Sequence, residues 1–520
     1  MRRIIGILVV FIVAFSFSAK STNEIKNTEK KAAVAKENAE RPNIIFVFAD
    51  DMGYGDVKCN NPKSRVNTPN VDKLASQGAR FTDAHTVGSL CAPSRYGLLT
   101  GRNPSIWTNY VDIESEAWNC LTMPQMLKKQ GYNTVCVGKW HFGVLFEGKD
   151  GRWGAPSPVG KKFPKPADNW LLTNPTRLGP IDRGFDYFFG TPLQPGGKWY
   201  ANMEGNTLLG KPKLSPNLPA TKDFVIEKWM GVILNKTQEK INEYSKKDDP
   251  FFLYFPLNSP HKPIVPDEPF KGKSVIGQYG DYCEQVDWCL GEVMKTIDEA
   301  GIADNTILIF TSDNGSYYYP GSVNSSEEDE QELIKNKHKA NGVYSEGKGQ
   351  PEEGGHRVPY IIRWPGQIEP GSVNNTTISL GDHLATFAAL TGYELAQEDA
   401  IDSWNILPIL KGENPGKQYQ NRAFFHFNNN PRVDAVRVGK WKMIPECYYK
   451  EKKPNKGKKG KLTSEEKKKL KTFIPGQLYD LSTDPGEQVN LWDQNPEVVA
   501  KLKARLSRYK KNKHNASHIN

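Results

Sequence analysis

Short apolar segments that alternate with helical patterns constrain the fold of this chain more than any other feature of its sequence. The segments are apolar at successive positions, which is typical of strands buried on both faces of a parallel sheet. The residues that we predict to form such strands are 43–48, 134–137, 251–255, 306–310 and 358–362. Helical patterns between them, at 123–130 and 279–300, predict an α/β fold: a doubly wound, mostly parallel sheet flanked by helices.

Polar residues directly follow four of these predicted strands. Ligands of an open parallel sheet bind beyond the carboxyl ends of its strands, so residues at these ends are expected to share one crevice. The four groups are Asp50-Asp51, Gly138-Lys139-Trp140-His141, Ser259-Pro260-His261 and Ser312-Asp313-Asn314-Gly315. We therefore predict one functional site built from all four strand ends.

The first and last of these groups have the composition of a metal site. Asp50, Asp51, Asp313 and Asn314 offer carboxylate and amide oxygens, which are the preferred ligands of Ca²⁺ or Mg²⁺. Zn²⁺ would be expected to recruit histidine or cysteine. Each aspartate alone also fits a turn or a helix cap. Because they occur as two pairs at two strand ends, they favour a metal site.

Cys91 precedes Pro93, which suits the first turn of a helix, so we place this cysteine at a helix N-terminus. One interpretation is a small buried apolar side chain, and another is a thiolate nucleophile whose pKa the helix lowers. A thiolate is a soft ligand that poorly matches carboxylate oxygens around a hard cation. An oxygen-bearing group at position 91 would match them far better.

Two longer motifs resemble the signatures of the formylglycine-dependent sulfatases, an arylsulfatase-type family of the alkaline-phosphatase-like superfamily. They are Cys91-Ala-Pro-Ser-Arg95 with the trailing Leu98-Leu-Thr-Gly101, and residues 131–141. The resemblance continues through the strand-end groups, Gly347-Lys348 and residues 353–359 to a C-terminal segment at 478–491. It therefore spans nearly the whole mature chain.

The resemblance implies that a formylglycine-generating or sulfatase-maturating enzyme oxidises Cys91 to formylglycine. The hydrated aldehyde bears two hydroxyl groups, which resolves the mismatch with a hard cation. The implied ion is one Ca²⁺, held by Asp50, Asp51, Asp313, Asn314 and an oxygen of the modified residue 91. One hydroxyl would attack sulfur to give a covalent sulfated intermediate, and loss of the proton from the second would expel sulfate.

The resemblance also implies roles for the basic side chains of the motifs. Arg95 would orient the formylglycine hydroxyls, and His141 would be the base for the elimination step. His261 would protonate the leaving oxygen, while Lys348 shares the sulfate with it. Lys139 would add positive charge as the sulfate group passes through its transition state. Lys139, His261 and Lys348 are thus the implied substrate-binding residues.

The implied reaction is hydrolysis of a sulfate monoester, which we expect on a sulfated carbohydrate in a galactose or N-acetylgalactosamine setting. The formal net charge of +10 and the Gly, Pro and Trp-rich loops predicted over 142–250 fit such a substrate. One alternative is a phosphatase or phosphonate monoester hydrolase of the same superfamily. Another is a non-catalytic glycan-binding relative in which Cys91 is not converted. No nucleic-acid partner is expected, because the lysine-dense residues 450–471 lack stacked aromatics and a nucleic-acid-binding motif.

The first residues have the pattern of an export signal: two arginines, an apolar stretch at 4–15 and small residues at 16–19. Because about 20 apolar residues are needed to span a bilayer, we expect a signal peptide over 1–19 and no stable transmembrane anchor. The expected location is periplasmic or secreted. The seven cysteines are an odd number, which leaves at least one out of any intramolecular pairing.

The composition and hydrophobic pattern of the remaining chain predict its domains. We expect a polar tether over 20–40, an N-terminal catalytic domain over 41–420, and a smaller C-terminal α+β domain with an antiparallel sheet over 421–520. Within this last part, residues 450–471 hold eleven lysines against three glutamates. We interpret this insertion as a solvated loop, and the alternative is an electrostatic contact for a polyanion.

Overall fold

The computed structural model describes most of the chain from residue 41 onward. The described residues are 41–105, 111–154, 170–195, 201–210, 212–215, 218–221, 224–318, 333–429, 432–450 and 471–511. The predicted signal peptide, the tether and most of the lysine-rich insertion lie outside them. Within the described residues, no helix combines the length and the apolar character that crossing a membrane requires.

A ten-stranded sheet forms the centre of the N-terminal part of the described chain, in the order β15-β2-β14-β13-β1-β12-β4-β7-β8-β9. Its middle strand, β1, pairs in parallel with β12 on one side and β13 on the other. Two further parallel strands, β4 and β7, extend the sheet beyond β12. These five strands are β1 (Asn43–Asp50), β4 (Asn133–Lys139), β7 (Tyr187–Thr191), β12 (Phe251–Pro260) and β13 (Thr306–Ser312). The predicted mostly parallel sheet is confirmed.

The two ends of the sheet depart from the parallel pattern. The predicted strand at 358–362 forms β14 (Tyr360–Arg363), which pairs antiparallel with β13 and with β2 (Ala79–Phe81). Our expectation of a parallel strand there was wrong, because burial on both faces makes a strand apolar whatever its direction. The other edge strands are β15 (Ser372–Asn374), β8 (Met203–Glu204) and β9 (Thr207–Leu208).

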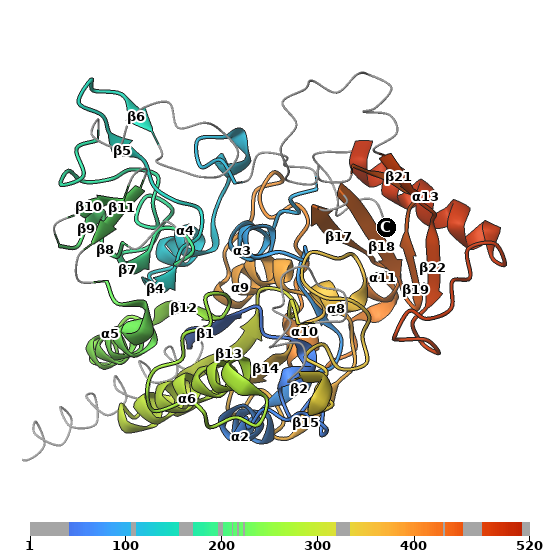
Figure 1. Ribbon diagram of the computed structural model, residues 1–520, viewed down its shortest axis with the longest axis horizontal. Helices are drawn as coiled ribbons and strands as arrows, with labels where there is room; N and C mark the ends of the chain where they lie inside the picture. The colour runs from blue at the N-terminus through green and yellow to red at the C-terminus, as the bar shows by residue number, and fades with distance from the viewer. Residues whose placement is uncertain are drawn as a thin grey trace, which may run out of the picture.

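Side chains of β1 alternate between two hydrophobic cores, one on each face of the sheet. Ile44, Phe46 and Phe48 pack into one core, while Ile45 and Val47 pack into the other. Helices cover both faces, as Figure 1 shows. On one face lie α2 (Pro69–Gln77), α5 (Trp229–Tyr244) and α6 (Gly277–Glu299), and on the other α3 (Cys91–Thr100), α4 (Met123–Lys129) and α9 (His383–Thr391). The sheet is therefore doubly wound.

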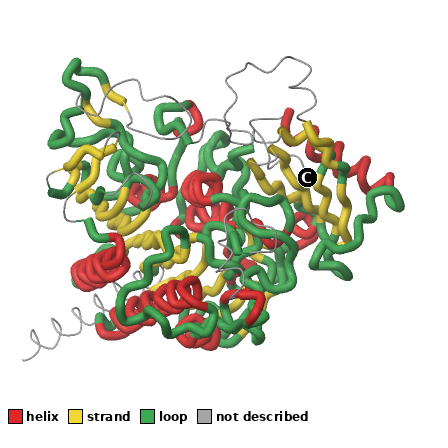
Figure 2. The backbone as a smooth tube through the Cα atoms, in the orientation of Figure 1, coloured by secondary structure: helices red, strands yellow, loops and turns green. Residues whose placement is uncertain are grey.

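A smaller antiparallel sheet forms the C-terminal part, at the right of Figure 2. Its four strands pair in the order β17-β18-β19-β22, and helix α13 covers one of its faces. Val499, Leu502 and Leu506 of α13 pack on Val436 and Met443 of the sheet. These elements are β17 (Ala423–Asn429), β18 (Arg432–Val438), β19 (Trp441–Ile444), β22 (Gln477–Asp480) and α13 (Pro496–Lys511). The predicted antiparallel C-terminal sheet is confirmed.

Backbone hydrogen bonds join the C-terminal sheet to the segment that precedes α3. The amide of Phe427 in β17 donates to the carbonyl of Val87 (2.7 Å), and the amide of Ser89 donates to the carbonyl of Phe427 (3.2 Å). Buried ion pairs add to this contact: Asp83 pairs with Arg437, and Lys442 pairs with Glu353. The small sheet thus supports the segment that leads into Cys91.

The remaining described strands and α-helices are short. They are β3 (Ala84–His85), β5 (Phe146–Glu147), β6 (Trp153–Gly154), β10 (Pro212–Ser215), β11 (Leu218–Thr221), α8 (Glu353–His356), β16 (Ile378–Ser379), α10 (Leu407–Leu410), α11 (Gly416–Gln420), β20 (Cys447–Lys450) and β21 (Lys471–Ile474). Strands β20 and β21 pair with each other at the two ends of the lysine-rich insertion. All seven cysteines are free thiols.

Candidate active site

The carboxyl ends of β1 and β13 bring together the four residues predicted to bind a metal. Asp50 is the last residue of β1, and Asp51 follows it with a left-handed φ of 71°. The Asp51 amide donates to Asp313 Oδ1 (3.1 Å), and Asn314 Nδ2 donates to Asp51 Oδ1 (2.7 Å). All four side chains are buried. The expected convergence of these strand ends is therefore observed.

The donor atoms of this cluster fit a hard cation. Asp50 Oδ2 and Asp313 Oδ2 lie 3.6 Å and 2.8 Å from the same Arg95 Nη2, and the buried Oδ1 of Asn314 has no hydrogen-bond partner. A buried polar atom without a partner is rare, and an ion that accepts oxygen ligands would satisfy it. His261 lies near the same atoms, but imidazole is not a ligand that Ca²⁺ or Mg²⁺ prefers. The oxygen set of Asp50, Asp51, Asp313 and Asn314 is the better candidate.

Cys91 is the first residue of α3 and points into this cluster. Its Sγ lies 3.3 Å from Asp50 Oδ1, 3.9 Å from Asp51 Oδ1 and 3.4 Å from Lys348 Nζ. Burial, together with the carboxylates of Asp313 and Asp50, raises the pKa of the thiol well above its usual range. Burial and the carboxylates thus act on the pKa of the thiol in the opposite direction to the helix N-terminus, and they disfavour a thiolate at this position.

Three cations compensate the buried carboxylates. Lys139, the fully buried last residue of β4, pairs with Asp50, and Lys348 Nζ lies 2.6 Å from Asp51 Oδ1. Arg95 donates to Asp313 Oδ2 from Nε (3.1 Å) and Nη2 (2.8 Å). Burial alone would raise the pKa of Asp50, but Lys139 and its other cationic neighbours hold it well below its usual range. Burial and the Asp50 carboxylate raise the pKa of Asp313 to about 7.

The two predicted catalytic histidines also reach this centre. His141 follows β4 with a left-handed φ of 84°, and burial together with Lys139 and Arg95 lowers its pKa well below the usual range. His261 follows β12, with its Nε2 3.8 Å from Asp51 Oδ2. Burial and Lys348 lower the pKa of His261 to about 4. Both imidazole rings are therefore neutral at neutral pH in the absence of an anionic ligand.

Sequence reasoning missed one polar residue of this site, Gln194. It follows β7, and its Nε2 lies 2.9 Å from His261 Nδ1. We predicted only loops over 142–250, whereas this region contributes β7 to the main sheet and helix α5 to its cover. The rule that found the other strand-end residues applies to β7 as well, but glycine and proline around this short strand obscured it.

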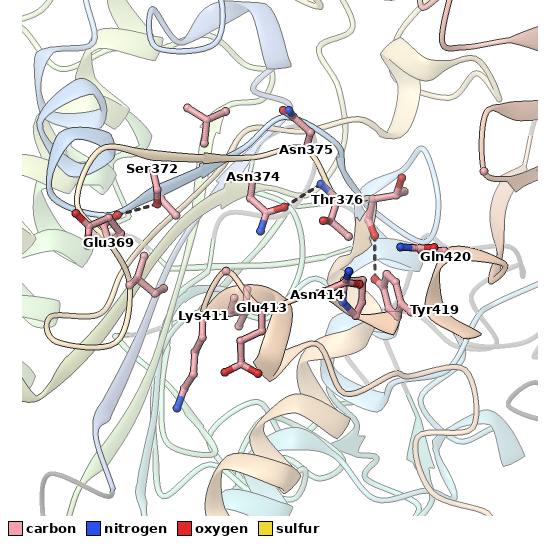
Figure 3. A pocket seen from close by; sticks show the side chains of 18 of the residues that line it. Glu369, Ser372, Asn374, Asn375, Thr376, Lys411, Glu413, Asn414, Tyr419 and Gln420 are labelled. Atoms are coloured by element: carbon pink, nitrogen blue, oxygen red, sulfur yellow. Dashed lines mark hydrogen bonds between the residues drawn. The ribbon is translucent and has the colours of Figure 1, made fainter. Parts of the chain in front are cut away.

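A cleft lies away from this centre, at the edge of the sheet formed by β15 (Figure 3). It has a volume of about 750 Å³ and shares no residue with the carboxylate cluster. Its lining combines amide and hydroxyl side chains with apolar ones and with the charged Glu369, Lys411 and Glu413. None of the residues predicted for the site lines this cleft.

Comparisons with known proteins agree with this geometry. A family model described as Sulfatase matches residues 42–393, and one described as the C-terminal region of aryl-sulfatase matches residues 419–518. An N-acetylgalactosamine-6-O-sulfatase of Bacteroides thetaiotaomicron is 33% identical over 512 residues, covering 91% of this chain and 94% of the relative. Arylsulfatase A of Homo sapiens is 33% identical over 485 residues, covering 89% and 87%. A solved structure described as "6S-sulf", from work on glycosaminoglycan metabolism by Bacteroides thetaiotaomicron, has a TM-score of 0.73 at 30% identity, covering 91% of this chain and 100% of its own.

Proposed function

Because this chain belongs to the sulfatase family and is a sulfuric ester hydrolase, we propose that it removes sulfate from a sulfated carbohydrate at the centre around Cys91. The observation that supports this site most directly is the meeting of residue 91 with carboxylates and cations from separate strand ends. Cys91 lies within hydrogen-bond distance of both Asp50 and Lys348, so an ester placed there meets a nucleophile position and positive charge together.

The centre is proposed to hold one Ca²⁺ and a modified residue 91. Asp50, Asp51, Asp313 and Asn314 would hold the ion, which as a Lewis acid polarises the sulfate oxygens when bound. We propose that a maturating enzyme converts Cys91 to formylglycine. This group, once formed, supplies the attacking oxygen and an internal route for releasing sulfate. An oxygen at position 91, whose Sγ lies 3.3 Å from Asp50 Oδ1, suits a hard cation better than a thiolate does.

The basic side chains around Cys91 would bind the ester and move its protons. Lys139 and Lys348 would place positive charge where the sulfate enters, and Arg95, which pairs with Asp313, would orient the hydroxyls of the modified residue 91. Neutral His141 is suited to accept a proton in the elimination step. His261 would protonate the leaving oxygen, because the negative charge of a bound sulfate ester favours its protonated form.

The proposed substrate is a sulfated galactose or N-acetylgalactosamine unit of a glycan. Relatives named N-acetylgalactosamine-6-sulfatase, from Bacteroides thetaiotaomicron and from Mus musculus, support this choice of sugar. The signal-like first 19 residues support export to the periplasm or the exterior, where polysaccharides are met.

The test uses the full chain produced in a host that matures sulfatases. Mass spectrometry of the tryptic peptide over residues 81–95 reports the conversion of Cys91 in each preparation. The matured protein is then assayed against defined sulfated monosaccharides and oligosaccharides, with aryl sulfate and aryl phosphate as references. We expect release of sulfate from a galactose-type sugar and much slower release of phosphate. Converted protein that acts only on small non-carbohydrate sulfates, such as choline sulfate, would contradict the proposal.

A further inference from the structure

One buried amide side chain holds the segment that carries Lys348. Asn341 is only 4% exposed, and its Oδ1 accepts a hydrogen bond from the amide of Ser316 (2.8 Å). Its Nδ2 donates to the carbonyls of Ser316 (3.1 Å) and Glu346 (2.8 Å). A backbone amide can only donate and a carbonyl can only accept, so all three bonds require the same orientation of the side-chain amide.

These bonds join the chain after β13 to the loop before Lys348. Ser316 lies two residues after Asn314, a proposed metal ligand, and Glu346 lies shortly before Lys348. The backbone amide of Lys348 donates to the same Ser316 carbonyl (3.0 Å) that accepts from Asn341. The Lys348 backbone is therefore held against Ser316, and Asn341 bonds to both sides of this contact.

The space around Asn341 is closely packed. A Cβ atom on Gly53 would lie 2.6 Å from Asn341 Oδ1, and one on Gly315 would lie 3.0 Å from it. Both glycines belong to segments that carry proposed metal ligands, since Gly53 comes shortly after Asp51 and Gly315 directly follows Asn314. Asn341 thus lies where three segments of the centre meet: the one after β1, the one after β13 and the one that carries Lys348.

The position of the Lys348 ammonium group depends on where its backbone is held. Its Nζ reaches the centre, at 2.6 Å from Asp51 Oδ1 and 3.4 Å from Cys91 Sγ. A displacement of about 1 Å at a reacting centre can lower a rate roughly 100-fold, even when the change that causes it is far from the chemistry. A loosened segment at 346–348 would therefore place the charge of Lys348 away from a bound sulfate.

We propose that Asn341 is a positioning residue for Lys348, a role that rests on the proposed function. It holds residues 346–348 against Ser316, so that Nζ of Lys348 meets the sulfate group beside residue 91. The three hydrogen bonds of the Asn341 side chain go to the backbone, so Asn341 acts on the ester through the segments that it joins. No bond forms or breaks at Asn341 itself.

A double-mutant cycle separates this role from a general effect on the fold. If Asn341 acts through Lys348, its replacement has little left to disturb once the lysine side chain is gone. A change that merely loosens the fold lowers the rate by the same factor whether or not Lys348 is present. The ratio of the two factors therefore isolates the positioning of Lys348.

The experiment measures kcat/KM for 4-nitrophenyl sulfate and for the sugar sulfate that the wild type accepts, in wild type, Asn341→Ala, Lys348→Met and the double variant. Rates are expressed per converted chain, counted by mass spectrometry of the tryptic peptide over residues 81–95. We expect Asn341→Ala to lower kcat/KM roughly 100-fold in the wild-type background and about threefold or less in the Lys348→Met background. Asn341→Ser, whose side chain is too short to reach both segments, should show the same pattern, so the test does not depend on the folding of one variant.

Asn103→Ala is the matched control. Asn103 is also 4% exposed, and its side chain also bonds to two backbone groups: Oδ1 accepts from the amide of Ser105 (3.0 Å), and Nδ2 donates to the carbonyl of Phe425 (2.7 Å). Any loss of activity in Asn103→Ala should be the same factor with and without Lys348.

Two outcomes would overturn the role of Asn341. One is an equal loss in both backgrounds, which indicates structural damage only, and the other is wild-type activity in both Asn341 variants. Wild-type protein with converted residue 91 and no activity on any sulfate would instead contradict the proposed function.

Discussion

Asn314 shows at the residue scale what the centre is suited to hold. Its Nδ2 donates to Asp51 and to the carbonyl of Gly315, yet its buried Oδ1 has no partner. A buried polar atom left unpaired destabilises the fold by roughly 1–3 kcal/mol, and an ion at this position would offset that cost. The neighbouring carboxylates make a cation the fitting ligand.

Replacing this oxygen should weaken cation binding. In Asn314→Leu we expect the affinity for Ca²⁺ to fall by at least about tenfold, because even changes behind the direct ligands of a metal have effects of that size. Isothermal titration of chelator-treated protein with Ca²⁺ measures it. Asn258→Leu is the matched control, since Asn258 is also buried with an unpartnered Oδ1 but lies on β12 and hydrogen-bonds Tyr282. Equal affinities in the two variants would contradict the assignment.

Most residues of the site could be predicted from sequence, because their positions at strand ends are local information. The protonation state of Cys91 could not be predicted from the sequence around it. A helix N-terminus predicts a lowered thiol pKa, but burial and the carboxylates of distant segments raise the pKa of Cys91 instead. Gln194 was missed for a similar reason, since its contact with His261 depends on a strand that its own sequence signals weakly.

At the scale of elements, strands β4 and β12 approach too closely for side chains at one position. Gly138 in β4 has a φ of 132°, and a Cβ atom there would lie 2.0 Å from the carbonyl oxygen of Pro256. The next residue is Lys139, which pairs with Asp50. The glycine therefore permits the close strand contact that places this lysine in the centre.

Gly138→Ala should thus destabilise the protein strongly. We expect a loss of about 3 kcal/mol in the free energy of unfolding, the upper end for a forced steric contact in a packed core. Gly205→Ala is the control: Gly205 also has a positive φ, 56°, but a Cβ there meets nothing within 4 Å. Its loss should stay near 1 kcal/mol, from backbone strain alone. Urea unfolding measures both values, and similar losses would show that close packing at β4 is not the cause.

Long apolar strands and helices were readable from sequence, whereas direction and short edges were not. The pattern over 306–310 predicted β13, because both faces of that strand are buried under helices. The equally apolar β14 runs the opposite way, and only its tertiary pairing with β13 and β2 decides this. The three-residue strands β2 and β15 carry too few residues for any periodicity.

At the scale of the whole molecule, buried charges join the C-terminal sheet to the catalytic part. Lys442 on β19 is fully buried and lies 3.0 Å from Glu353 and 2.8 Å from Glu487. Removing one partner of a buried ion pair leaves the other charge uncompensated. The contact between the two sheets therefore depends on this lysine.

Lys442→Met should lower the free energy of unfolding by about 3–5 kcal/mol, the usual effect of breaking a buried ion pair. Lys440→Met is the control, because Lys440 is half-exposed and pairs with Asp480 at the surface. The free energy of unfolding of Lys440→Met should fall by no more than about 1 kcal/mol. Urea unfolding followed by tryptophan fluorescence checks both, and equal losses would argue against a buried electrostatic contact.

Three buried histidines at the same contact predict sensitivity to acid. Burial lowers the pKa of His85, and burial with cationic neighbours lowers the pKa of His356 and His426 well below their usual range. Acidic groups Asp83 and Glu353 and basic groups Arg357, Arg437 and Lys442 surround them.

Below about pH 6.5 the unfolded chain takes up protons on these histidines that the folded protein excludes, so stability falls as the pH falls. Each histidine that the folded protein keeps neutral contributes a share of the loss between pH 6.5 and 5. In His426→Gln the loss of stability between pH 6.5 and 5 should be smaller than in wild type, by the contribution of one histidine. The difference between the urea midpoints at the two pH values measures this loss. An unchanged difference would show that His426 is not held neutral.

The enclosure of Cys91 sets an order on the events of biosynthesis. Its side chain is 5% exposed, and the segment before it is hydrogen-bonded to Phe427, a residue made much later in translation. Under the proposed conversion of Cys91, the oxidising enzyme would have to reach the thiol before the downstream strand is in place. Maturation and folding would then compete in time, and a chain that folded first would stay inactive.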